Sequence, residues 1–98
     1  MFVVIFRAKV RVIDDEYLAT AGELRDLALR EFGCLEFHSL LENQHEVALS
    51  YWPDEESIRA WKAHPDHMLA QQSGKQKWYE SYSVQVARVE REYNSHQE

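Results

Sequence analysis

The stretch FVVIFRAKVRVI, residues 2–13, decides the fold. It is rich in Val, Ile and Phe and contains no Gly or Pro, which is typical of a β-strand. The first five residues are all apolar, and the second half alternates between apolar side chains and Lys9 or Arg11. A run that is apolar on both faces indicates a central strand whose two faces are both buried at its start.

The segment that follows predicts an amphipathic helix over residues 15–32. Asp14, Asp15 and Glu16 place acidic groups where a helix begins, and Gly33 follows the last periodic residue as a C′ glycine would. Apolar residues recur at helical spacing from Tyr17 to Ala28, so one side of this helix covers another element.

Two alternating segments predict a β-hairpin. They are residues 34–42 (CLEFHSLLE) and residues 46–52 (EVALSYW), joined by the polar turn 43–45. In the second segment, Val47, Leu49 and Tyr51 share one side.

A second helix begins after Pro53 and runs to Ala63. Pro65 interrupts it near His64, because proline lacks an N–H group, and we expect Asp66 to cap a second segment. Ser73-Gly74 is then expected to end the helix. The rest of the chain is interpreted as a short turn or extended piece over residues 76–79, a last strand over residues 82–91, and a polar tail over residues 94–98.

The element order is therefore β-α-β-β-α-β, which predicts an α+β fold of the ferredoxin-like class with a four-stranded antiparallel sheet. Residues 1–93 form a single domain in this interpretation. Both helices lie on one face of the sheet, yet the first strand is apolar on both faces. A second copy of the chain is the simplest cover for the other face, so we predict a homodimer.

Composition limits the partners. The chain has 98 residues and a net charge of −6, without a run of basic residues, which argues against a nucleic-acid partner. No segment approaches the length of a membrane span, and residues 2–6 lack the basic region of a signal peptide. Cys34 is the only cysteine, which favours a reducing compartment and a small buried side chain rather than a nucleophile. The expected location is the cytoplasm.

Candidate chemistry gathers in residues 61–82, WKAHPDHMLAQQSGKQKWYESY. Trp61 fits a ligand pocket and a protein core equally well, whereas residues 78–82 are expected in the core or the dimer interface. His64 and His67 have the spacing of metal ligands on a helix, but Pro65 disturbs that geometry and no third ligand has a marked spacing, so no metal is predicted.

Two polar residues lie on strands that are otherwise apolar. Arg7 and His38 can contact an anionic or carbonyl-bearing ligand, and a cross-strand pair with Glu36 or Glu90 explains them equally well.

The whole order of elements and the run AWKAHPDHMLAQQSGKQKWYESYSVQVARVEREY, residues 60–93, resemble the antibiotic biosynthesis monooxygenase family of dimeric α+β barrel proteins. The resemblance implies a cavity between the sheet and the second helix of each protomer. Members that need no cofactor oxidise activated aromatic compounds there with dioxygen. Haem-degrading members use an Asn on the first strand, a Trp on the second helix and a His ten residues later. This chain has Phe6-Arg7, Trp61 and Gln71 at those positions, so two of the three depart.

The leading hypothesis is a cofactor-independent enzyme or binding protein for a small aromatic or hydrophobic ligand. Trp61 lies against the ligand, His64 or His67 moves a proton or orients a carbonyl, and the polar contacts come from the residues Arg7, His38 and Gln71. One alternative is haem binding or degradation, with His67 as a substitute axial ligand. The other is a non-catalytic dimer that binds a ligand or serves a structural role.

Overall fold

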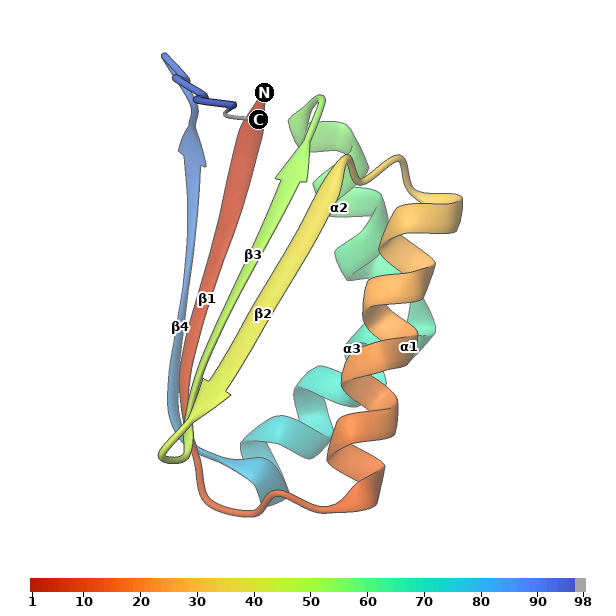
Figure 1. Ribbon diagram of the computed structural model, residues 1–98. Helices are drawn as coiled ribbons and strands as arrows, with labels where there is room; N and C mark the ends of the chain where they lie inside the picture. Colours follow the sequence, from red (N-terminus) through yellow and green to blue (C-terminus); the bar gives the residue numbers. More distant parts are fainter. Residues whose placement is uncertain (97–98) are drawn as a thin grey trace.

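The computed structural model describes residues 1–96, which form an antiparallel sheet with helices on one of its faces (Figure 1). The strand order is β2-β3-β1-β4. The elements are β1 (Phe2–Val10), α1 (Asp15–Glu31), β2 (Glu36–Glu42), β3 (His45–Trp52), α2 (Glu55–Ala63), α3 (Pro65–Ser73), the π-helical turn η1 (Gly74–Trp78) and β4 (Tyr79–Arg88). The ferredoxin-like α+β prediction is confirmed.

β1 lies inside the sheet, with β3 on one side and β4 on the other. Val3 and Val4 point to opposite faces, and their exposed fractions are only 9% and 5%. The predicted burial of both faces at the start of this strand is therefore confirmed. The strand ends at Val10, three residues before the predicted Ile13, because Arg11 and Val12 bond to the carbonyl of Trp78.

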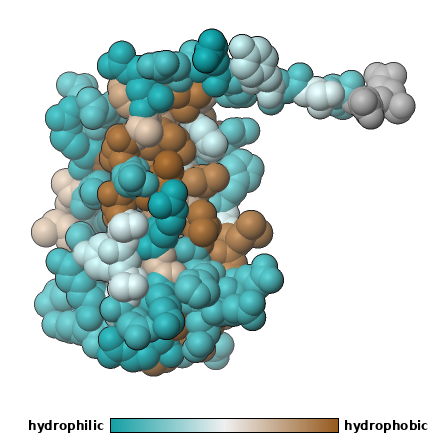
Figure 2. Space-filling model, turned by 90° about the vertical axis from the view of Figure 1, so that its left-hand side faces the viewer, coloured by the Kyte–Doolittle hydropathy of each residue, from teal (hydrophilic) through white to brown (hydrophobic). Residues whose placement is uncertain are grey.

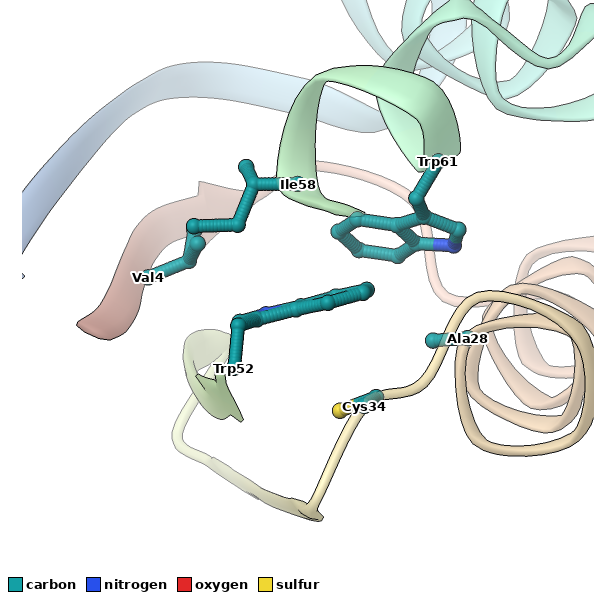
Figure 3. Close-up of a cluster of buried hydrophobic side chains, with 6 residues drawn as sticks. All are labelled: Val4, Ala28, Cys34, Trp52, Ile58 and Trp61. Atoms are coloured by element: carbon teal, nitrogen blue, oxygen red, sulfur yellow. The ribbon is translucent and has the colours of Figure 1, made fainter. Parts of the chain in front are cut away.

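The core under α2 is built around two tryptophans. The rings of Trp52 and Trp61 lie 5.1 Å apart, with Ile58 and Val4 beside them (Figure 3). Cys34 closes the other side of this cluster, where burial raises the pKa of its thiol, as expected of a small buried side chain.

Helix α1 starts and stops as its sequence predicts. The carboxylate of Asp14 accepts a hydrogen bond from the backbone N–H of Tyr17 at 2.8 Å. At the other end, Gly33 adopts φ 77°, which an L side chain rarely does, and the N–H of Cys34 reaches back to the carbonyl of Ala28 at 3.1 Å. This closure turns the chain directly into β2.

The hairpin is tighter than predicted. Its turn contains Asn43 and Gln44, both with positive φ, as in a type I′ connection, and β3 starts at His45 rather than after it.

The second helix divides at Pro65, as predicted, into α2 and α3. The residue that caps α3 is His64, whose Nδ1 accepts the backbone N–H of Asp66 at 3.1 Å; the prediction of Asp66 as the cap was wrong. α3 ends at Ser73, where the helix was expected to break, but a π-helical turn follows in place of the expected turn or extended piece. Gly74 stays in the right-handed helical region and the chain continues as η1.

β4 begins at Tyr79 and ends at Arg88, three residues earlier at each end than predicted. Its early start follows from η1, which delivers Tyr79 directly to a bridge with Val10. Of the predicted polar tail, residues 94–96 carry no regular structure, and Gln97 and Glu98 lie outside the described residues.

The sheet face opposite the helices, here called the open face, carries apolar side chains from three strands. Seen from the side away from the helices, the molecule shows a hydrophobic band in its upper and central part, interrupted by hydrophilic side chains (Figure 2). On this face Leu40 of β2 pairs with Val47 of β3, and Ile5 of β1 lies diagonally across from Val47. Leu40 is 77% exposed. Among the described residues, no helix is long and apolar enough to cross a membrane.

Candidate functional site

A cavity of about 340 Å³ lies between the sheet and its helices. Its size is at the lower end of the range for small-molecule sites, roughly 300–1,000 Å³. The floor comes from the helix-facing side chains of the sheet, and the walls come from α1, α2, α3 and η1. Aromatic rings contribute much of its surface: Phe6, Tyr17, Phe37, Trp61, Trp78, Tyr79 and Tyr82.

The sheet side of the cavity follows from strand alternation. Ala48 and Ser50 of β3 pair with Phe6 and Val4 of β1, so all four face the helices. Small residues on β3 leave the volume that a larger side chain would fill. The hydroxyl of Ser50 is held by the indole N–H of Trp52 at 2.8 Å.

On the helix side, Trp61 and His67 form one wall. Their rings meet edge to face with centroids 4.5 Å apart, and the indole N–H of Trp61 donates to the carbonyl of Leu24 at 3.2 Å. Burial, with a smaller effect from the charge of Lys62, lowers the pKa of His67 to about 4, so its ring is neutral near pH 7. Its Nδ1 is buried and has no hydrogen-bond partner within residues 1–96.

The π-helical turn η1 brings a second group of aromatics to the cavity. Trp78 packs edge to face on Tyr17, with centroids 5.5 Å apart. Tyr79 lies 5.4 Å from Phe6 and 5.8 Å from Tyr82. Short π-helical segments occur frequently at functional sites, and this one replaces an ordinary turn at the point where Trp78 and Tyr79 must both face inward.

A buried carboxyl group faces this aromatic cluster. Glu46 is 9% exposed, lines the cavity, and accepts a hydrogen bond from the hydroxyl of Tyr17 at Oε1. Burial raises the pKa of Glu46, and the Tyr17 bond opposes that rise. Burial and the neighbouring Glu46 in turn raise the pKa values of Tyr17 and Tyr79 well above the usual range of a phenol.

The residues expected at the site divide into two groups. Trp61, His67 and Gln71 all line the cavity. His64 does not, because its ring caps α3 and packs on Phe32 with centroids 5.9 Å apart.

Arg7 and His38 do not line the cavity either. Their register partners Val47 and Leu49 belong to the open face, on the far side of the sheet from the helices. Within residues 1–96, neither of them forms an ion pair with a glutamate.

Several cavity residues were missed by the sequence interpretation. Trp78 lies in a buried cluster with Val10 and Tyr17, and Tyr79 packs against that cluster, as expected of core residues. What the sequence interpretation missed is that Trp78, Tyr79 and Tyr82 also line the cavity.

Glu46 and Tyr17 were not considered for the site. A signal for Glu46 lies in the alternation of β3. Glu46 and Trp52 are an even number of residues apart, so their side chains point to the same face of the sheet, and Trp52 is fully buried.

The polar groups of the cavity do not form a metal site. Within residues 1–96, no three His, Cys, Asp or Glu side chains gather as metal ligands. Toward haem the cavity offers His67 as its one imidazole, and that ring is packed against Trp61. The positions that resemble those of the haem-degrading Asn and His hold Phe6-Arg7 and Gln71. Phe6 is apolar and lines the cavity, Arg7 lies on the open face, and Gln71 is an amide. These residues do not fit the haem-degrading pattern.

A family model described as antibiotic biosynthesis monooxygenase matches residues 1–73. The chain belongs to the antibiotic biosynthesis monooxygenase family. Two curated proteins are similar to this chain in sequence. The uncharacterised protein YqjZ of Bacillus subtilis is 35% identical over 92 residues, which cover 93% of this chain and 81% of that protein. The jasmonate monooxygenase ABM of Pyricularia oryzae is 32% identical over 93 residues, which cover 91% of this chain and 43% of that protein.

Solved structures share the fold of this chain. SnoaB, a cofactor-independent oxygenase from Streptomyces nogalater, superposes with a TM-score of 0.78 at 13% identity, covering 96% of this chain and 97% of that one. Rv0793 from Mycobacterium tuberculosis gives a TM-score of 0.79 at 14% identity, with 95% and 98% coverage. At these identities the likeness concerns the fold alone.

Proposed function

We propose that this protein is a monooxygenase that oxidises a small aromatic or hydrophobic substrate in the cavity without a bound metal or flavin. The observation that carries the proposal is the cavity of about 340 Å³ with aromatic side chains on both its sheet side and its helix side. Rigid aromatic walls suit a flat apolar ligand, and a few polar groups then fix its orientation. The jasmonate monooxygenase and the cofactor-independent SnoaB lend this choice of chemistry further support.

Chemistry of this kind needs no reductant when the substrate supplies all the electrons. In an anthrone-type substrate, a methylene carbon loses two hydrogens and gains one oxygen atom from dioxygen. The second oxygen atom leaves as water. The substrate gives up its first electron most readily after it has lost a proton, so the cavity must hold the ionised form and exclude water.

Trp61, His67 and Gln71 position the substrate in this proposal. Trp61 is fixed by Leu24 and Trp52, so its ring gives the ligand a rigid surface. His67 is a weak base, because its pKa is about 4. Its role is therefore that of a neutral imidazole that orients a substrate carbonyl or hydroxyl, and Gln71, one helical turn further, adds an amide beside it.

The test is oxygen consumption with anthrone- and quinol-type compounds, comparing the wild type with His67→Ala. The matched control is His38→Ala, since His38 lies on the open face. We expect the His67 variant to lose most of the turnover and the His38 variant to keep it. Absence of turnover in the wild type, or equal loss in both variants, would contradict the proposal.

We also propose that the active form is a homodimer joined through the open face. Support comes from the exposed apolar side chains Leu40 and Val47 of two adjacent strands, and from the hydrophobic band in Figure 2. Sedimentation equilibrium should give twice the chain mass for the wild type. Val47→Lys places a charge in the middle of this face and should give the monomer, whereas Glu36→Lys near its edge should not.

A further inference from the structure

We propose that Glu46 is the proton acceptor of the cavity, and that the ligand is a neutral aromatic or enolic molecule whose acidic hydroxyl lies against the Glu46 carboxylate. The inference rests on the proposed function, because it names the base that the oxidation needs and the substrate group on which that base acts. Glu46 is the second residue of β3, and no residue of the site predicted from the sequence supplies a carboxylate.

The position of Glu46 is unusual for a carboxylate. Glutamate is rarely buried unless a partner neutralises it. Glu46 is 9% exposed and forms no ion pair within residues 1–96. Its register partner on β1 is Ala8, which is itself buried, so the neighbouring strand offers no polar contact. A structural role alone would place this charge in an unfavourable environment.

Tyr17 shows from which kind of donor this carboxylate accepts a hydrogen bond. Its phenol donates a hydrogen bond to Oε1. Glu46 also lines the cavity, and Tyr17 occupies Oε1, so we assign Oε2 to the ligand. A second phenol or enol in the cavity can therefore donate to Oε2 as Tyr17 does to Oε1.

The step is a simple proton transfer. The substrate O–H bond breaks, a new O–H bond forms at the Glu46 carboxylate, and the electron pair stays on the substrate oxygen. No electron leaves the substrate at this stage. The product is a neutral Glu46 and an ionised substrate, so the single negative charge moves from the protein to the ligand that must react with dioxygen.

The surroundings of Glu46 favour a single charge. The groups that face it are phenols, Tyr17 from α1 and Tyr79 from β4, and burial keeps both protonated at neutral pH. The charged or titratable groups elsewhere on the cavity wall are Arg25 of α1, Lys62 of α2 and His67 of α3, with Tyr82 on β4. Two negative charges, on carboxylate and ligand together, would repel strongly in this apolar space.

The repulsion of a second negative charge gives the experiment. The probe is 4-nitrophenol, whose binding is measured by equilibrium dialysis at one pH below and one above its own ionisation. The control ligand is 4-nitroanisole, which has the same ring and no acidic hydrogen. In the wild type the ionised probe meets the Glu46 carboxylate, so its affinity falls sharply. Glu46→Gln keeps the shape of the side chain and removes the charge. We expect the ratio of neutral to ionised affinity to fall by about tenfold or more in this variant.

Three outcomes separate the possibilities. Equal ratios in the wild type and Glu46→Gln would overturn the role of Glu46 while leaving the cavity as an aromatic site. Failure of both probes to bind the wild type would count against the proposed function itself. Glu36→Gln removes a carboxylate from the open face and so should keep the wild-type ratio; if it changes the ratio as Glu46→Gln does, the effect comes from the net charge of the protein and not from the cavity. Unchanged binding of 4-nitroanisole in each variant shows that the cavity is intact.

Discussion

The two helical glycines of this chain offer a matched test of how the cavity wall is built. A methyl group added at Gly74 would lie 2.5 Å and 2.7 Å from Cε2 and Cδ2 of Tyr79. A methyl group added at Gly22 would meet only the end of the Arg25 side chain, at 3.8 Å. Both glycines are in helical segments, so the gain in helix propensity on replacement by alanine is comparable, about 0.5–1 kcal/mol.

The difference between the two variants is then the cost of moving the Tyr79 ring. That ring cannot withdraw freely, because Phe6, Tyr17 and Tyr82 surround it at centroid distances of 5.4, 6.2 and 5.8 Å. Overpacking of this kind costs about 1–3 kcal/mol. Gly22→Ala should therefore stabilise the protein, and Gly74→Ala should be neutral or destabilising, with a gap of about 1–3 kcal/mol between them.

The assay is thermal unfolding followed by tryptophan fluorescence, with all proteins at the same concentration. For a domain of this size each kcal/mol moves Tm by about 4–8 °C, so the two variants should differ by several degrees or more. The Gly74 variant should also bind 4-nitroanisole more weakly, because the displaced ring enters the cavity. Equal stabilisation by the two alanines would refute the reasoning, since it would mean that Tyr79 is not held over Gly74.

Three further predictions concern single side chains. Tyr17→Phe removes the donor to Glu46 and should cost about 1–3 kcal/mol in urea denaturation, whereas Tyr93→Phe, at a site 85% exposed, should cost nothing measurable. His67 has a pKa of about 4 in the folded protein, against 6.5 for a free imidazole. Its contribution to the free energy of unfolding is therefore complete above pH 6.5 and is lost as the pH falls toward 4, with a slope of at most about 1.4 kcal/mol per pH unit. This slope should be absent in His67→Gln. Trp61→Ala should destabilise by about 3–5 kcal/mol, and Trp61→Phe by clearly less, because a ring still packs on Trp52.

Most of the fold follows from local sequence signals. Asp14, Gly33 and Pro65 act at short range, and each marks an element boundary through its own backbone or capping chemistry. Gly74 misled the prediction because a glycine after a helix usually ends it. Here the glycine serves a contact with Tyr79, five residues further along the chain, and its backbone stays helical. No local signal distinguishes these two uses of glycine.

The site was harder to predict, because it depends on which sheet face receives the helices. Alternation in β3 separates Val47, Leu49 and Tyr51 from Glu46 and Ser50, but alternation alone does not say which set faces inward. In most sheets the more apolar set packs under the helices. In this chain the set that contains Glu46 does so, and the more apolar set lies on the open face. Arg7 and His38 were assigned to the cavity for the same reason, because they point to the same face of the sheet as Val47 and Leu49.

This reversal has an energetic consequence. Empty volume in a core costs about 24 cal/mol per Å³, so a cavity of about 340 Å³, if it were sealed and dry, would cost about as much as the whole net stability of a small domain. The helix side of the sheet thus contributes less to folding than it does in a fully packed protein, and it also carries the buried Glu46. The open face is the remaining source of apolar burial, with Val3 and Ile5 at its centre. Stability and dimerisation should therefore be coupled: Tm should rise with protein concentration in the wild type, and Val47→Lys should unfold at a lower temperature that no longer depends on concentration.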